Sequence, residues 1–160
     1  MRKLVFFLIL SLFSSALLAV NLKNLNFPNY NKTGDLVWVS KTNPQNVIVI
    51  QELNNMWFEL NENNLPQYLE KQSEVRSMIN SFSGITDWQI EKADIVKTNK
   101  QNVLKMNGLY KAEKLTHFLI EAQLFKKPNI YQIKISSNAK NELSPTNTQE
   151  VLEIFYKELN

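Results

Sequence analysis

The 160-residue chain has no cysteine, a single histidine and only three glycines. Without cysteine it forms no disulfide, binds no iron–sulfur cluster, holds no zinc through thiolates and has no thiol nucleophile. Three glycines are too few to favour a loop that cradles phosphate, and neither a P-loop nor a Gly-x-Gly-x-x-Gly motif is present. We therefore expect no cofactor.

The single histidine, His117, lies in a segment that alternates like a strand, and the chain has no Gly-x-Ser-x-Gly motif. A serine–histidine–aspartate triad would have to use this residue, but a histidine on a strand is more often a packing or surface residue. A metal site would need mostly carboxylates, and none are clustered as metal ligands usually are. The sequence predicts a protein that is not an enzyme and binds no metal.

Paired carboxylates are a catalytic arrangement that the sequence leaves open, because the two groups of a glycosidase come from distant positions. The candidates are Glu52, Glu59, Glu62 and Glu121. Surface solubility accounts for each of them more simply. A carboxylate-dependent hydrolase is therefore the least favoured of the functions considered.

Residues 1–19 have the layout of a secretory signal peptide, in which two basic residues precede an almost unbroken apolar run. We expect cleavage after Ala19, with cleavage after Ala16 as the alternative. The competing interpretation is an uncleaved membrane anchor over residues 4–20, a length at the lower limit for crossing a bilayer. We expect the mature chain in the periplasm or outside the cell, with membrane attachment only if this segment is retained.

Removal of the signal segment also changes the charge of the chain. The full chain has a net charge of +3, but residues 1–19 hold two basic residues and no acidic ones, so the remainder carries +1. This nearly neutral balance gives no electrostatic reason to expect a nucleic acid partner. Hydrophobic residues make up 44% of the chain, which is ample for the packed core of one domain.

The mature chain begins with a polar, turn-rich stretch. Residues 20–34 are expected to form an irregular arm that leads into a single domain over 35–160. Two segments rich in β-branched residues, 35–40 and 47–53, are separated by a proline- and asparagine-containing turn. This pattern predicts a β-hairpin.

Apolar residues at spacings of three and four predict two main helices, over 66–82 and 147–159. Gly84 lies just beyond the first helix, where a left-handed C-cap is common. Thr146 and Gln149 fit a capping box at the start of the second helix. Arg76 is assigned to the solvated face of the first helix.

The segment between the helices predicts three or four antiparallel strands. Asn107-Gly108, between apolar runs, predicts a hairpin turn because both central residues of such a turn need positive φ. The strands over 115–125 and 130–136 alternate, which places alternate side chains on opposite faces of the sheet. In the later strand, Gln132, Lys134 and Ser136 are expected to point outward; in the earlier one, His117, Leu119, Glu121 and Gln123 share one face.

This order of elements resembles the PsbP-like fold, a family of small exported α+β domains. The likeness spans roughly residues 35–159 and includes the helix ending at Gly84, the strand starting at Trp88 and the closing helix. It implies an antiparallel sheet of about five to six strands covered by two helices, and an accessory or scaffolding role without catalysis. The histidines and carboxylates that bind metal in some members match no positions here. A cystatin-like or NTF2-like half-open sheet is the alternative fold.

Aromatic residues indicate where the protein could make contacts. Trp57 and Phe58 are adjacent in a polar segment and cannot both point into one core if that segment is extended, so one is a candidate contact with another protein. Trp88, Phe118 and Tyr131 are candidates for lining a pocket between helix and sheet. We expect an exported domain that binds another envelope or secreted protein or supports an envelope assembly. The alternative is a carrier of a small ligand or lipid.

Overall fold

The computed structural model describes residues 22–54, 59–98 and 101–159, without the side chains of 79–83. The elements in chain order are a short 3-10 helix η2 (Leu22–Asn24), β1 (Tyr30–Gly34), β2 (Val37–Ser40), β3 (Val47–Asn54), α2 (Leu65–Ser83), β4 (Ile85–Thr98), β5 (Gln101–Ala112), β6 (Leu115–Lys126), β7 (Asn129–Ser137), a second 3-10 helix η3 (Lys140–Leu143) and α3 (Pro145–Leu159).

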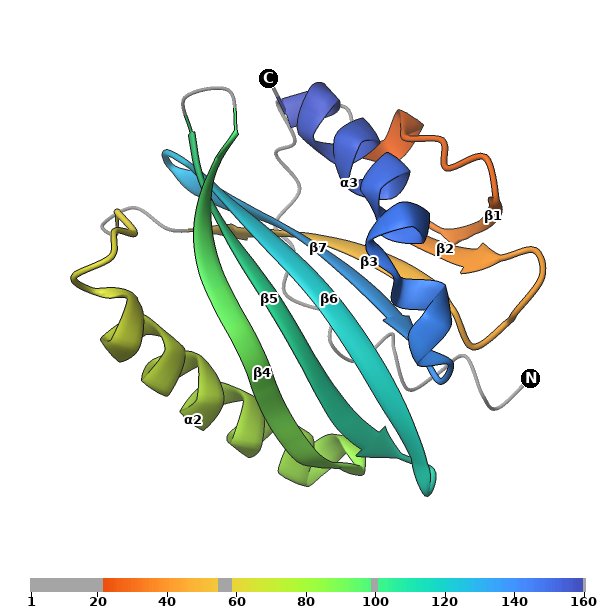
Figure 1. The fold of residues 1–160 in the computed structure, drawn as a ribbon, viewed down its shortest axis with the longest axis horizontal. Helices are drawn as coiled ribbons and strands as arrows, with labels where there is room; N and C mark the ends of the chain where they lie inside the picture. Colours follow the sequence, from red (N-terminus) through yellow and green to blue (C-terminus); the bar gives the residue numbers. More distant parts are fainter. Residues whose placement is uncertain (1–21, 55–58, 99–100, 160) are drawn as a thin grey trace.

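The described strands form one sheet of seven, in the order β1-β2-β3-β7-β6-β5-β4, and every neighbouring pair is antiparallel. After β3 the chain passes through α2 to the far edge of the sheet, and β4 to β7 then return strand by strand (Figure 1). The predicted α+β class and antiparallel sheet are confirmed. The sheet has seven strands rather than five to six, because Tyr30–Gly34 also pairs with β2.

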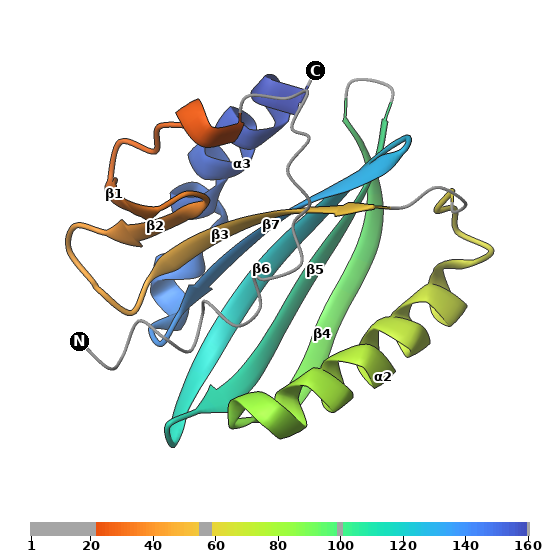
Figure 2. The ribbon, with the colours of Figure 1, turned by 180° about the vertical axis from the view of Figure 1, so that it is seen from behind.

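The two helices cover opposite faces of the sheet (Figure 2). The face under α3 carries the main hydrophobic core, because alternate residues of β3, β6 and β7 point toward the helix. The helix contributes Val151, Leu152, Phe155 and Leu159 to this core. On the other face, α2 packs mainly against β4 and the smaller apolar cluster built on Leu60, Leu104 and Met106.

Both helices lie where the apolar periodicity predicts them, within two residues at each end. Gly84 ends α2 in the left-handed conformation, with φ of 71°, so the predicted C-cap is confirmed. The predicted capping box at Thr146 is wrong. α3 begins at Pro145, two residues earlier than predicted, and the Ser144 hydroxyl accepts a hydrogen bond from the backbone amide of Asn147 at 3.4 Å.

Residues 22–34 differ from the irregular arm that their polar composition predicts. Leu22, Leu25 and Phe27 are buried in the main core. The ring of Phe27 meets Trp38 edge-on, with centroids 5.0 Å apart. Because these three side chains are buried in the core, the segment is part of the domain, and its last five residues form β1.

The predicted hairpin turn at Asn107-Gly108 is wrong, because β5 runs straight through both residues. Gly108 is required there for a different reason: a Cβ atom at this position would lie 2.5 Å from the backbone oxygen of Gln89 in β4. The close approach accompanies two register shifts between β4 and β5. The turn between β5 and β6 is instead made by Glu113 and Lys114, which have φ of 51° and 68°.

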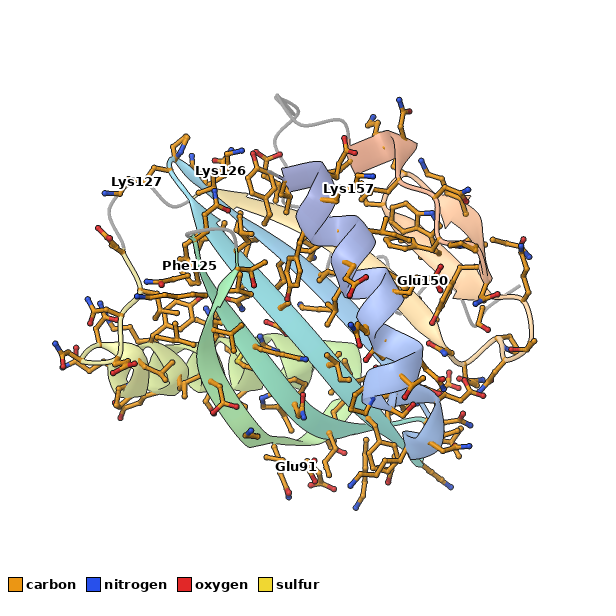
Figure 3. The ribbon with its side chains drawn as sticks, turned by 45° about the horizontal axis from the view of Figure 1, so that its top comes forward. Glu91, Phe125, Lys126, Lys127, Glu150 and Lys157 are labelled. Carbon is orange, nitrogen blue, oxygen red and sulfur yellow. The ribbon has the colours of Figure 1, made fainter. Side chains whose placement is uncertain are left out.

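A charged contact joins strand β6 to the last helix, α3. Lys126, at the end of β6, donates a hydrogen bond to the carbonyl oxygen of Leu159 at 2.8 Å, and Figure 3 shows it near the C-terminal end of α3. A cation at this end is favoured by the helix dipole.

Among the described residues, no helix is both long and apolar enough to cross a membrane.

Candidate functional site

A group of polar side chains occupies the α2-facing side of the sheet, where apolar residues would be expected. Register places Gln51 opposite Gln132, Gln132 opposite Gln123, and Lys134 opposite Glu121. These side chains therefore form two adjacent rows across β3, β7 and β6. Together with two residues of α2, they make up what we call the polar cluster: Gln51, Tyr68, Arg76, Glu121, Gln123, Gln132 and Lys134.

An ion pair between Arg76 and Glu121 holds the centre of the polar cluster. The Nη2 atom of Arg76 lies 2.7 Å from Oε1 and 2.9 Å from Oε2 of Glu121. The Glu121 side chain is 0% exposed and that of Arg76 is 13% exposed. A buried pair of this kind depends on each charge keeping its partner, because an isolated charge is expensive to desolvate.

Glutamine amides complete the coordination of Glu121. Gln123 and Gln132 both donate to its Oε1 atom. Tyr68, on α2, donates its hydroxyl to Oε1 of Gln123 at 2.5 Å. The hydrogen-bond acceptors at the centre of the cluster are therefore already occupied by protein donors.

The charges of the cluster shift one another's pKa values. Burial alone would raise the pKa of Glu121, but the charges of Arg76 and Lys134 and the hydrogen bonds outweigh burial and lower it, so this carboxylate is ionised at neutral pH. Burial lowers the pKa of Lys134 to about 8, with the charge of Arg76 acting in the same direction and that of Glu121 opposing it. Lys134 is therefore still mainly protonated at pH 7.

An aromatic stack lies beside the polar cluster on the same face. The rings of Trp88 and Tyr110 stack with centroids 6.0 Å apart, and those of Tyr110 and His117 with centroids 5.1 Å apart. The guanidinium carbon of Arg76 lies 4.5 Å from the centroid of the Trp88 ring, within the range of a cation–π interaction. Arg76 thus connects the stack to Glu121.

Several polar atoms around this stack have no hydrogen-bond partner within the described part of the chain. They are Arg76 Nε, Trp88 Nε1, Tyr110 Oη, His117 Nδ1 and Ser136 Oγ. Tyr110, His117 and Ser136 are each more than nine-tenths buried. Burial raises the pKa of Tyr110 to about 12, and the Ser136 hydroxyl beside it offsets part of that rise.

The aromatic residues predicted to line one pocket lie on different faces of the sheet. Trp88 belongs to the stack on the α2 side. Tyr131 is buried in the main core on the α3 side, and Phe118 packs against that core. The predicted contact residues Trp57 and Phe58 lie outside the described residues.

The candidate carboxylates are not brought together. Glu121 faces α2, whereas Glu52 lies in β3 on the opposite side and accepts a hydrogen bond from Asn129. Glu59 is exposed and lies 3.7 Å from Lys127, and Glu62 is exposed. Within the residues described, no three carboxylates or histidines are grouped as metal ligands.

Sequence reasoning missed most of the polar cluster. Gln132 and Ser136, expected to point outward, and Glu121, attributed to surface solubility, are buried instead. Arg76, assigned to the solvated face of its helix, points at the sheet. The available signal was a set of polar residues at alternate positions in two consecutive strands, a pattern that is equally typical of a solvent-facing sheet.

Comparisons with known proteins bear on the fold. No family model and no curated protein matches the chain. Among solved structures, a cyanobacterial PsbP protein from Synechocystis sp. PCC 6803 matches with a TM-score of 0.53 and 6% sequence identity, covering 76% of this chain and 71% of that one. A protein of unknown function from Pseudomonas aeruginosa matches with a TM-score of 0.46 and 10% identity, covering 76% and 74%. The predicted resemblance to the PsbP-like fold is confirmed at the level of fold.

Proposed function

We propose that this chain is an exported, non-enzymatic domain that binds a small polar molecule on the α2-facing side of its sheet. One observation carries the proposal: Trp88, Tyr110, His117 and Ser136 each have a buried polar atom without a hydrogen-bond partner in the described part of the chain. Leaving such an atom without a partner costs about 1–3 kcal/mol. Four of them around one place are accounted for if a ligand completes their hydrogen bonds.

The arrangement favours binding over catalysis. Glu121 is held ionised between Arg76 and Lys134 and its oxygens are occupied, so it is poorly suited to act as a general acid. His117 stacks on Tyr110, and the sequence has no Gly-x-Ser-x-Gly motif that would supply a serine nucleophile. The apolar signal-like segment over residues 1–19 supports export.

Native mass spectrometry of the full chain, purified from its own cells without denaturation, tests the proposal. We expect an added small mass that disappears after unfolding and refolding. Tyr110→Phe and Ser136→Ala should abolish this mass without lowering the stability of the refolded chain, because each removes an unsatisfied buried hydroxyl. Tyr156→Phe, the same chemical change on α3, is the control and should retain it.

A protein partner is the second candidate function. Val75 and Met78 are apolar residues of α2 with exposed side chains, on a helix whose inner face carries the polar cluster. Exposed apolar side chains three residues apart lie on one side of a helix and could contact another envelope protein. If Val75→Ser with Met78→Ser leaves capture of every partner from an envelope extract unchanged, this candidate fails.

A further inference from the structure

We infer that the small molecule carries a carboxylate group, which binds between Lys134, Arg76 and the hydroxyls of Tyr110 and Ser136. This inference rests on the proposed function and adds the chemical class of the ligand. Two independent features of the site support it: an excess of positive charge and an excess of hydrogen-bond donors.

The charge of the polar cluster is not balanced. Arg76 and Lys134 are two cations, and Glu121 is the one anion of the cluster as defined. His117 adds no charge at neutral pH because burial lowers its pKa below 6.5. The cluster thus carries one net positive charge in a largely buried setting, where a single counter-charge would be strongly favoured. A monocarboxylate supplies that charge.

The site also has more hydrogen-bond donors than acceptors. Glu121 Oε1 already accepts bonds from Arg76, Gln123 and Gln132. The atoms left over include Arg76 Nε and Trp88 Nε1, which can only donate. The Tyr110 and Ser136 hydroxyls can donate as well. A group made only of acceptors, such as a carboxylate, therefore satisfies these atoms better than an amide or an amine.

The positions of these residues in the fold are consistent with a shared carboxylate site. Ser136 and Lys134 are alternate residues of β7 and lie on the same face of the sheet. Tyr110 lies opposite His117 in the register of β5 and β6, and the Ser136 hydroxyl is near enough to Tyr110 to affect its pKa. Arg76 reaches the same face from α2. Side chains from three neighbouring strands and one helix therefore lie on the same face of the sheet.

Matched pairs of small probes separate charge from shape. Formate, acetate, propionate and butyrate would be titrated calorimetrically into the refolded full chain at pH 7 and constant ionic strength, each beside its primary amide. We expect at least one carboxylate to bind and its amide to bind about tenfold more weakly or not at all, as for the loss of a charge-assisted hydrogen bond. Lys134→Met and Ser136→Ala should each weaken carboxylate binding, the first by about tenfold or more.

Lys111→Met is the matched control, because Lys111 is exposed and pairs with Asp87 on the surface. It should leave the affinity unchanged. The inference is overturned if amides bind as well as carboxylates, if Lys134→Met has no effect, or if a co-purified molecule is present that no carboxylate displaces; the proposed binding function then still stands. If neither series binds and the natively purified chain carries no small molecule, the binding function fails too.

Discussion

Tyr110 and His117 face each other across β5 and β6, and their rings stack nearly parallel, with an interplanar angle of 7° and centroids 5.1 Å apart. The pair fixes one end of the aromatic stack that extends through Trp88 to Arg76. Because His117 is the only histidine of the chain, its protonation can be followed without interference from another imidazole.

His117 should make stability depend on pH in mildly acidic solution. Burial lowers the pKa of His117 from 6.5, an effect that the charge of Glu113 partly offsets. The unfolded chain therefore binds more protons than the folded chain as the pH falls below 6.5, and the free energy of unfolding should decrease there. Urea unfolding at about pH 7 and about pH 5 measures this decrease. In His117→Phe it should be smaller, and equal decreases in the two proteins would contradict the prediction.

Removing one partner of the ion pair between Arg76 and Glu121 should lower the free energy of unfolding far more than replacing both partners. Arg76→Met leaves Glu121 buried without its nearest cation, so unfolding should become easier by about 3–5 kcal/mol. Arg76→Met combined with Glu121→Met should recover much of that loss. Urea unfolding of the unmodified chain and of the two variants measures both effects.

A surface pair provides the control for this experiment. Lys92 and Asp94 lie 2.8 Å apart, but their side chains are largely exposed, so Lys92→Met should change the free energy of unfolding by less than about 1 kcal/mol. A single Arg76→Met variant that is as stable as Lys92→Met would show that Glu121 is not held as described.

Substitutions in the turn between β5 and β6 should make the fold more stable. Glu113 and Lys114 have φ of 51° and 68°, a conformation that asparagine and glycine adopt more readily than glutamate and lysine. Glu113→Asn with Lys114→Gly should therefore raise the free energy of unfolding by about 1 kcal/mol. Gly108→Ala should do the opposite, because the new Cβ would meet the backbone of Gln89. Thermal unfolding distinguishes the two, and a destabilised turn variant would refute the assignment.

These glycine and asparagine positions show why the fold was more predictable than its details. Helix periodicity and strand alternation depend on residues close in sequence, and they located α2, α3 and the long strands β6 and β7. Asn107-Gly108 has the local chemistry of a turn, but the backbone of β4 passes beside Gly108 and fixes it within a strand. That constraint comes from a distant segment and leaves no local pattern.

The candidate site was less predictable for the same reason. The polar residues of β6 and β7 alternate as they would on a solvent-facing sheet, and only the return of α2 over this face makes Glu121 a buried group. Trp88 was identified as a pocket candidate, but the sequence could not place it on the opposite face from Tyr131. Which face a side chain occupies depends on the tertiary position of the helices.

Lys134 should make carboxylate binding depend on pH in the alkaline range. Its pKa is lowered to about 8 by burial, and the groups that face it are Glu121 on β6, Gln51 on β3 and Arg76 on α2. Glu121, whose pKa is lowered, stays ionised near pH 8, so the cluster loses its net positive charge as Lys134 loses its proton. The affinity for acetate or propionate should therefore fall as the pH rises through about 8, and in Lys134→Met it should be weak and constant over the same range. Calorimetric titration at about pH 7 and about pH 9 measures the difference, and an affinity of the unmodified chain that is equal at both would exclude Lys134 as the cation that binds the ligand.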